Sequence, residues 1–553
     1  MDAQSKGRLL IVGWDGATFD LIKPYIDEGL MPNTAKLLED GAHRILESTI
    51  PTLSPAAWTS FFTGKNPARH GTFDFVYRPH GTYEILSTRN NLQSLGTLFH
   101  YASEAGRKVG SVNVPFTYPP QPVNGFMISG LGADLDWAYT YPSFLRDDLL
   151  KQDYRIDNPV HYNGHNDEAY LDAAIETTKI RARTTIDLMK TQPWDCFMVV
   201  FMNIDQLLSF VWHHMDESHP RHNPAQAHLG EKIKELHNYL DEILGEMLTI
   251  AGEDANVILA SDHGMGPLYK EVFLNNWLRE VGFMVDQKPQ VARGTYWRIM
   301  RTFGITREGI WRKIGRARTQ QMKALLPKPL HWIVPTEHPD LANEIDWSQT
   351  KAYGFGNIGQ IYINLVGREP HGIVNSGTEY DSVVADIKAQ LFELIDPETG
   401  ETIVDKVYTK DELYAGPFFD SAPDLNVIMK DYSYITQMRR ELAFSDVIRP
   451  FTGMSGFHRR EGIFAIKGPA IKSGHFDPAS ILDVMPTSLY LMGLAIPNDV
   501  DGQIMSEIIE SNFLENNPTQ YVSSLTIAQQ GEALTDSDEK KLQERLRSLG
   551  YLQ

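Results

Sequence analysis

An α/β fold with buried parallel strands and an inserted subdomain is what the 553-residue sequence predicts. Short apolar runs that end in polar residues recur along the first half of the chain, and stretches with helical periodicity separate them. Several runs end in an acid, and open α/β sheets bind ligands at the carboxyl ends of their strands. The pattern changes between residues 269 and 450. We therefore expect a core formed by residues 1–268 and 451–510, a cap at 269–450, and a tail at 511–553 with a short helix.

The composition is that of an ordinary soluble globular protein, with 42% hydrophobic and 22% charged residues. The formal net charge is −20, from 51 Lys and Arg against 71 Asp and Glu, which argues against a general nucleic-acid binder. The one cysteine, Cys196, excludes an intramolecular disulfide and fits a reducing compartment. No secretory-type apolar segment precedes the first strand, and no run of 18 apolar residues occurs. We expect a cytoplasmic protein.

The first two predicted strands lead to two residues whose side chains could bind a metal or act as a nucleophile. Residues 8–13 predict a buried strand that leads to Asp15, and residues 44–49 predict a strand that leads to Ser54. Pro55 suits the first position of a helix, so Ser54 should stand at a helix start, where backbone N–H groups and the helix dipole attract an anion. Taken alone, Ser54 is also a good N-cap, and Asp15 could cap the turn that follows it.

Further along the chain, apolar runs predict strands that lead to Asn113 and to Asp205. The sharpest run, NVILASDHGMG, predicts a buried strand followed by Asp262 and His263. Both side chains can reach one metal because the chain bends at the strand end. A purely structural reason for Ser-Asp-His-Gly in this setting is hard to find.

A group of histidines that begins with His213 and His214 follows Asp205. Clustered histidines can bind a metal. These lie near His-Pro and Asn-Pro turns, where solvated loop residues are the more common reading. We keep His213 and His214 as additional candidate metal ligands.

Residues 287–335 carry eleven Lys or Arg and a single acid, Glu308, in an otherwise acidic chain. Aromatic and aliphatic residues such as Trp297 and Trp311 alternate with that charge. The segment fits a lid over a phosphate substrate or a contact with a membrane surface or lipid, and it fits a solvated helical hairpin equally well.

Oxygen and imidazole ligands of this kind bind transition metals. Together with a serine at a helix start, they fit two-metal phosphoryl transfer, in which paired ions hold the attacking and the leaving oxygen. Metal coordination is also what makes a serine alkoxide accessible at neutral pH. The candidate ligands are Asp15, Ser54, Asp205, Asp262, His263 and His458.

The order of several motifs along the chain resembles that of a known family. The motifs VGWDG, PTLSPAAWTSFFTGKNPARHG, ASDHGMG and SGFHRREGIFAIKGPAI occur in the order found in the alkaline phosphatase superfamily, in its type I phosphodiesterase / nucleotide pyrophosphatase branch. The resemblance runs from Leu9 to about Met505. It implies a doubly wound, mostly parallel sheet flanked by helices, with an inserted cap.

The resemblance also implies roles for single residues. Ser54 would be the nucleophile, and one divalent ion would be bound by Asp15, Asp262 and His263 and would touch Ser54. A second ion would be bound by Asp205 and His458 together with a histidine four residues after the aspartate.

The sequence departs from the family pattern at two positions. Ser209 stands where that histidine is expected, so the second ion site lacks a ligand. If the segment is helical, His213 lies about 12 Å further along the axis and cannot simply replace it. Ala57 stands where nucleotide pyrophosphatases place an asparagine that holds phosphoryl oxygens, and Asn113 is our candidate for an alternative amide contact to substrate.

The predicted function is a metal-dependent phosphoric ester hydrolase, of phosphodiesterase or phosphatase type, that forms a phosphoserine on Ser54. Its cofactors would be two divalent ions, zinc or manganese, and its partner a small phosphorylated substrate. Two alternatives remain: a phosphotransferase that uses the same intermediate, and a non-catalytic member that binds a phosphorylated ligand. A sulfatase is disfavoured because the arginine of the sulfatase maturation signature is missing after Ser54.

Overall fold

The computed structural model describes residues 7–88, 95–287, 345–437, 446–527 and 536–548. Its core is a ten-stranded, mostly parallel sheet in the order β20-β2-β19-β9-β1-β8-β5-β6-β7, with β21 also paired to β2. Only the pairs that β19 makes with β2 and β9, and the pair β6 with β7, are antiparallel within this described sheet. The strands are β1 (Leu9–Trp14), β2 (Ala42–Glu47), β5 (Val109–Val114), β6 (Gly125–Ser129), β7 (Thr140–Tyr141), β8 (Cys196–Phe201), β9 (Asn256–Ala260), β19 (Glu461–Lys467), β20 (Gly474–His475) and β21 (Ala479–Ser480).

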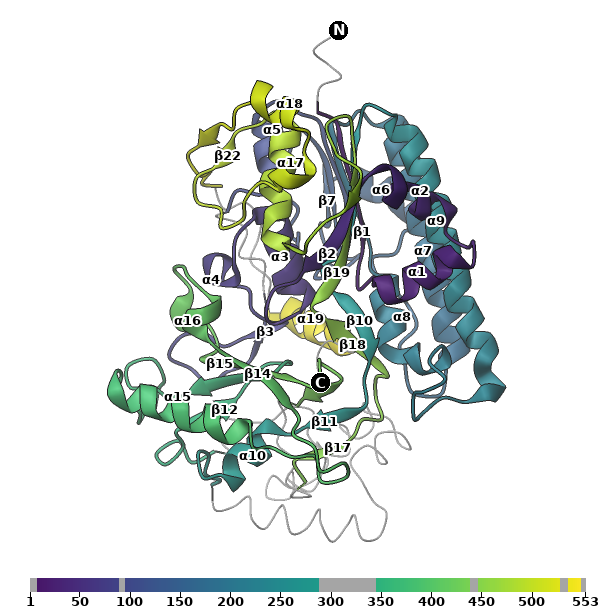
Figure 1. Ribbon diagram of the computed structural model, residues 1–553. Helices are drawn as coiled ribbons and strands as arrows, with labels where there is room; N and C mark the ends of the chain where they lie inside the picture. The colour runs from purple at the N-terminus through teal and green to yellow at the C-terminus, as the bar shows by residue number, and fades with distance from the viewer. Residues whose placement is uncertain (1–6, 89–94, 288–344, 438–445, 528–535, 549–553) are drawn as a thin grey trace.

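Helices cover both faces of this sheet (Figure 1), so the predicted doubly wound α/β fold is confirmed. One face is covered by α1 (Phe19–Asp27), α2 (Pro32–Asp40), α7 (Asp167–Thr191), α8 (Asn203–Val211) and α9 (Ala227–Ala251). The other face is covered by α3 (Ser54–Thr63), α5 (Leu98–Glu104) and α17 (Val484–Leu491). Other short elements are α4 (Pro67–His70), α6 (Leu145–Lys151), β3 (Val76–Tyr77), β4 (Leu86–Ser87), α18 (Ser511–Asn516), β22 (Ile496–Pro497), β23 (Tyr521–Val522) and α19 (Asp536–Ser548).

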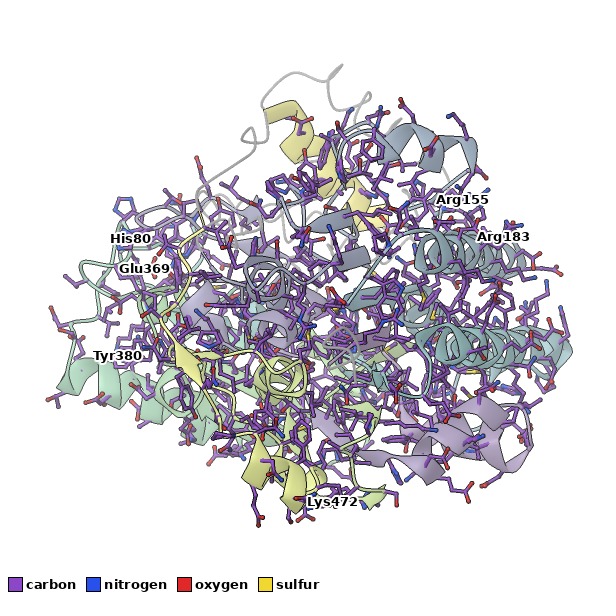
Figure 2. All side chains as sticks on the ribbon, turned by 90° about the horizontal axis from the view of Figure 1, so that it is seen from above. His80, Arg155, Arg183, Glu369, Tyr380 and Lys472 are labelled. Atoms are coloured by element: carbon purple, nitrogen blue, oxygen red, sulfur yellow. The ribbon has the colours of Figure 1, made fainter. Side chains whose placement is uncertain are left out.

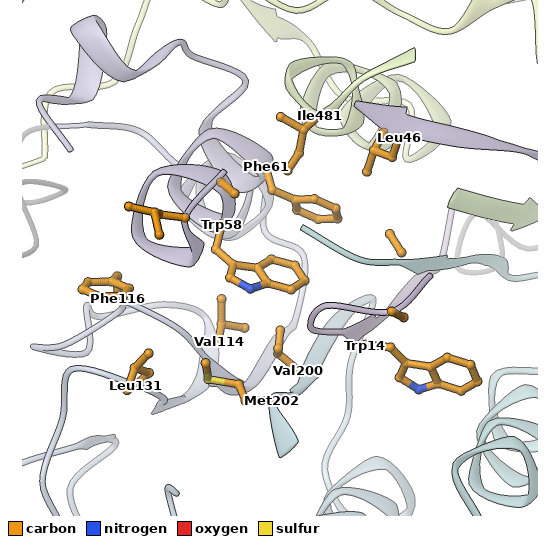
Figure 3. Packing of buried hydrophobic residues seen from close by; sticks show 14 of the residues in the cluster. Trp14, Leu46, Trp58, Phe61, Val114, Phe116, Leu131, Val200, Met202 and Ile481 are labelled. Atoms are coloured by element: carbon orange, nitrogen blue, oxygen red, sulfur yellow. The ribbon is translucent and has the colours of Figure 1, made fainter. Parts of the chain in front are cut away.

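The central strands are continuous apolar runs because helices bury both of their faces. Every residue of β1 and β8 is buried. Figure 3 shows Trp58 and Phe61 of α3 packed over the sheet near Val200 of β8. This packing fixes α3, and with it Ser54, against the central strands.

A second lobe lies beyond the core in Figure 1. It contains a sheet in the order β12-β13-β15-β14 and a three-stranded sheet in the order β16-β11-β17. The predicted basic segment lies outside the described residues from residue 288 onward. The elements are α10 (Leu274–Glu280), β11 (Lys270–Val272), β12 (Ala352–Gly354), β13 (Gln360–Ile363), α15 (Thr378–Leu391), β14 (Val404–Thr409), α16 (Lys410–Leu413), β15 (Leu425–Met429), β16 (Tyr434–Thr436) and β17 (Ile448–Pro450).

Two contacts tie the second lobe to the chain that follows α3 and α4. The buried Asp74 carboxylate accepts hydrogen bonds from the backbone and side chain of Asn357, at 2.8 and 2.6 Å, and from Gln360 at 2.9 Å. Arg78 forms an ion pair with the buried Glu369. Figure 2 shows Glu369 at the end of the molecule opposite to Arg155 and Arg183.

No helix within the described ranges is long and apolar enough to cross a membrane.

Two local expectations need correction. The strand that was expected to run to Asp205 ends at Phe201, and Asp205 lies in the first turn of α8. Ser54 is the first residue of α3 rather than its N-cap, a position that Leu53 occupies. Both differences arise where a strand passes into a helix within one uninterrupted buried segment.

A candidate metal centre at Ser54

Ser54 lies at the buried N-terminus of α3, and its side chain does not cap the helix. Instead, Ser54 Oγ lies 3.4 Å from His263 Nε2. Pro55 occupies the next helical position, where its missing N–H costs nothing. The structure therefore directs the hydroxyl toward the strand-end residues of β9 rather than toward its own backbone.

Asp15 follows β1 directly and is completely buried. Its Oδ2 accepts a hydrogen bond of 2.7 Å from Trp58 Nε1. Gly16 has a φ of +68°, and a side chain there would place its Cβ only 3.0 Å from Asp205 Cβ. The Asp-Gly pair thus lets the chain pass close to Asp205, which brings a second acid toward the same site.

Asp262 and His263 follow β9 and are both completely buried. His263 Nδ1 lies 3.0 Å from the Gly264 carbonyl, which accepts its hydrogen and leaves Nε2 with a free lone pair. Nε2 lies 3.3 Å from Asp262 Oδ2 and 3.8 Å from Asp15 Oδ1. The atoms of three separate chain segments meet at this nitrogen.

The spacing fits a bound metal better than a hydrogen-bond network. Neither Asp15 Oδ1 nor Asp262 Oδ2 accepts a hydrogen bond from an N–H or O–H group of the described residues, although both are buried. Ligand atoms about 2.0–2.1 Å from a tetrahedral Zn²⁺ lie about 3.3 Å apart, whereas N–H···O bonds centre near 2.9–3.0 Å. The separations around His263 are 3.3 and 3.4 Å. Asp15, Ser54, Asp262 and His263 therefore fit a divalent ion.

A second group shares the same pocket and contains Asp205, His263 and His458. His458 Nε2 lies 3.1 Å from Asp205 Oδ1, and its Nδ1 lies 2.6 Å from the Thr52 carbonyl, which accepts its hydrogen. The rings of His263 and His458 are stacked with their centroids 3.7 Å apart. The two groups are thus adjacent, as the sequence predicts for a paired metal site.

The electrostatics of the pocket favour a cation. Burial, followed by the charges of Asp262 and Asp205, raises the pKa of Asp15 well above its ordinary value. Burial and Asp205 raise the pKa of Asp262 to about 7. Burial and the neighbouring His458 lower the pKa of His263 to about 3, so His263 is a neutral imidazole. Buried carboxylates that repel one another are stabilised by bound metal charge.

Burial alone would lower the pKa of His458, but Asp205 and its hydrogen bond outweigh this effect and raise it. His458 therefore forms a charge-assisted pair with Asp205 when no ion is bound. Binding of a metal to Asp205 would require this histidine to lose its proton.

The two departures from the family pattern lie on helices that carry a candidate site residue, Ser209 on α8 with Asp205 and Ala57 on α3 with Ser54. Ser209 lies one helical turn after Asp205 on α8, and it is buried. Residues four apart share a helix face, so a hydroxyl stands where the family pattern has an imidazole. Ala57 is also buried, one turn into α3, and offers no side-chain donor.

Asn113 has a left-handed backbone with a φ of 56° at the end of β5. Its Nδ2 donates to the Val200 carbonyl at 3.2 Å, and its Oδ1 accepts from the Tyr154 hydroxyl at 3.4 Å. These contacts hold the amide against the core. The predicted contact between Asn113 and substrate stays a prediction.

His213 and His214 form a short 3-10 helix, Trp212–His214, that continues from α8. Their ligand atoms group with Asp167 and not with Asp205 and His458. Because α8 is helical from Asn203 to Val211, His213 lies beyond the end of the helix whose first turn holds Asp205. The structure therefore brings the six principal candidates together and places these two histidines elsewhere.

Trp58 is a site residue that the sequence reading did not single out. It lies four residues after Ser54 on α3 and is completely buried, and its indole N–H binds Asp15. The spacing of four could have identified it, because such residues share one face of a helix.

The comparisons with known proteins give one matching family model and similar solved structures. The family model described as type I phosphodiesterase / nucleotide pyrophosphatase matches residues 9–458. Two solved structures are similar to the chain: murine ectonucleotide pyrophosphatase / phosphodiesterase 5, an inactive variant in complex with AMP, and its human counterpart. The murine structure is 12% identical, with a TM-score of 0.47, and the match covers 90% of this chain and 98% of that one. The human structure is 13% identical, with a TM-score of 0.44, and the match covers 91% and 100%.

No curated protein sequence matches the chain. The family model, however, spans most of the core and all six principal candidate residues, from Asp15 to His458. Its members are phosphodiesterase and pyrophosphatase hydrolases. The chain belongs to the type I phosphodiesterase / nucleotide pyrophosphatase family.

Proposed function

We propose that this protein is a metal-dependent phosphoric ester hydrolase that forms a covalent phosphoserine at Ser54. The observation that supports this most strongly is the meeting of Ser54 Oγ with His263 Nε2 beside two buried carboxylate oxygens, Asp15 Oδ1 and Asp262 Oδ2. The candidate nucleophile and the candidate metal ligands thus lie side by side around His263 Nε2.

Asp15, Asp262 and His263 would hold one ion beside Ser54, and Asp205 and His458 would hold a second. Zinc or manganese, when bound, would lower the pKa of the attacking hydroxyl and neutralise phosphoryl charge.

The chain's own residues would position the reaction. Ser54 Oγ forms the bond to phosphorus as the ester oxygen leaves with its electron pair, and water later releases the phosphate. The N-terminal end of α3 directs its dipole and backbone N–H groups at the phosphoryl oxygens. Trp58 holds Asp15 in one orientation, and the Gly264 carbonyl does the same for His263.

A comparison of Ser54→Ala with Ser60→Ala tests the proposal. Ser60 is buried on the same helix, but its Oγ contacts His70 at 3.0 Å. With bis-p-nitrophenyl phosphate and Zn²⁺ or Mn²⁺, Ser54→Ala should lose activity by about 10³-fold or more, and Ser60→Ala should retain it. Unchanged turnover by Ser54→Ala would remove Ser54 from the nucleophilic role.

The same assay separates the two alternatives. Acid-quenched wild-type enzyme should carry a p-nitrophenyl phosphoryl group on the peptide that contains Ser54, detected by mass spectrometry. A labelled enzyme that passes this phosphoryl group only to an added alcohol, and not to water, would be a phosphotransferase. A protein that binds phosphate esters without label or turnover would be the non-catalytic member.

A further inference from the structure

A second group of potential metal ligands lies at the far end of α8. Asp167 is the first residue of α7, and His213 and His214 form the 3-10 turn after α8. One ligand atom of each lies within 4.8 Å of the other two. The two imidazole rings are 4.0 Å apart. The tertiary fold therefore brings together two imidazoles and one carboxylate from segments 46 residues apart or more.

The contact between His214 and Asp167 has the spacing of two ligands of one ion. His214 Nε2 lies 3.3 Å from Asp167 Oδ1, the separation also found between His263 and Asp262. The His214 side chain is completely buried. The nitrogen beside the Asp167 carboxylate is Nε2, and it is the atom of this ring that is placed to bind an ion together with Asp167.

His213 is oriented as metal-binding histidines are. Ser455 Oγ donates to the Phe210 carbonyl at 2.8 Å, so its oxygen is left to accept from His213 Nδ1 at 2.9 Å. The proton on Nδ1 leaves Nε2 with a lone pair. Asp167 Oδ1 is fixed in turn by the Tyr162 hydroxyl at 3.0 Å.

One nearby group opposes a cation. The Arg221 guanidinium donates to the carbonyls of Gly453 and Met454, at 3.2 and 2.9 Å, and its charge acts on His213. The Asp167 carboxylate offsets this charge. The arginine therefore weakens cation binding without filling the place between the three ligands. Replacing Arg221 by a neutral residue should raise the metal affinity of the group.

This group is separate from the pocket around Ser54. Asp205 lies in the first turn of α8, and His213 follows eight residues later, about 12 Å further along a helix axis. An ion held there would brace the end of α8 against α7. It would also fix Ser455, which precedes the strand β18 (Gly456–Arg459) that carries His458.

We propose that Asp167, His213 and His214 form a zinc site, distinct from the centre at Ser54. Two imidazole nitrogens and one carboxylate oxygen are ligands that Zn²⁺ accepts in proteins. The ion would stabilise the packing of α8 rather than take part in phosphoryl transfer.

Metal counting on the full-length protein tests the proposal. The protein is stripped with a chelator, dialysed against Zn²⁺, and analysed by mass spectrometry for bound ions. Asp167→Asn and His214→Gln should each hold one ion per chain fewer than wild type, and His228→Gln, an exposed histidine at the start of α9, should hold the same number as wild type. Equal ion content in wild type, Asp167→Asn and His214→Gln would overturn the proposal, whether or not the protein hydrolyses phosphate esters.

Two further measurements do not depend on the folding of those variants. In wild type, Zn²⁺ should slow hydrogen exchange of the amides at residues 167–170 and 213–216; unchanged exchange there would refute the site. Arg221→Gln should bind the additional ion several-fold more tightly, because a nearby positive charge is removed. Equal or weaker binding would show that the group is an ion-pair network instead.

Discussion

Replacing Trp58 by phenylalanine removes the indole N–H that donates to Asp15 Oδ2 and leaves an aromatic ring in the same buried position. The bond of 2.7 Å fixes one carboxylate oxygen, and the other, Oδ1, lies 3.8 Å from His263 Nε2. Without the bond, the Asp15 carboxylate can rotate away from the ion. The variant therefore tests whether Trp58 orients a metal ligand.

The size of the effect follows from the type of bond. A hydrogen bond to a charged group contributes about 1.5–3 kcal/mol, which corresponds to about 10- to 100-fold in affinity. Loss of a group that orients a metal ligand commonly costs about the same factor. The Trp58 bond also lowers the pKa of Asp15 against the larger effects of burial and neighbouring acids. Trp58→Phe should therefore also shift the acid limit of metal binding to higher pH.

The assay is competition for Zn²⁺ with a chelating dye, at fixed ionic strength and over a range of pH. Phe61→Leu is the matched control, since Phe61 packs on the Trp58 ring at 5.1 Å from the same helix and does not contact Asp15 through a hydrogen bond. Phe61→Leu should lower the unfolding free energy and leave zinc affinity unchanged. If Phe61→Leu weakens zinc binding as much as Trp58→Phe, or if Trp58→Phe binds zinc within twofold of wild type, the reasoning is refuted.

Two further predictions concern the same pocket. Ser209→His should raise the affinity of the second site for its ion by about tenfold or more, because an imidazole one turn after Asp205 faces the same side of α8. Calorimetry measures this affinity. No gain would mean that another ligand already completes that site. In chelator, the unfolding free energy of wild type relative to Asp262→Asn should fall as pH rises from about 4 to about 7. Burial and Asp205 raise the folded-state pKa of Asp262 to about 7, so the folded wild type binds a proton that the unfolded chain has lost, whereas the amide in Asp262→Asn does not titrate. Urea denaturation at each pH measures the difference, and a constant or rising difference would contradict the assignment.

The strands could be predicted because burial on both faces produces continuous apolar runs, as in β1 and β9. The sequence also has helical spacing from residue 167 to residue 191, and α7 occupies the same residues. The end of β8 was not predicted, because Met202 and Ile204 continue the apolar character of the strand past Phe201 with only Asn203 between them. A continuous apolar run does not distinguish a buried strand from a buried helix.

The candidate site was predictable to the extent that strand ends determine it. Asp15 and Asp262 follow neighbouring parallel strands, so their side chains had to meet at one edge of the sheet. The position of His213 was not predictable, because it depends on Ser455, 242 residues further along the chain. The spacing of four places Trp58 on the same helix face as Ser54, but its hydrogen bond to Asp15 required the structure, because an indole N–H can donate to a carboxylate only where the fold brings one within reach.

The contacts of Asp74 matter for any attempt to exchange the second lobe of this protein. Asp74 belongs to the segment that follows α3 and α4, yet its hydrogen bonds go to Asn357 and Gln360 in the second lobe. Burial raises the pKa of Asp74 and the hydrogen bonds from Asn357 lower it, which leaves a pKa of about 6 and an ionised carboxylate at neutral pH. A lobe transplanted from a relative would have to supply equivalent amide donors, or residues 72–88 would have to be exchanged with it. Residues 72–88 and the second lobe should therefore be exchanged together, although they are far apart in sequence.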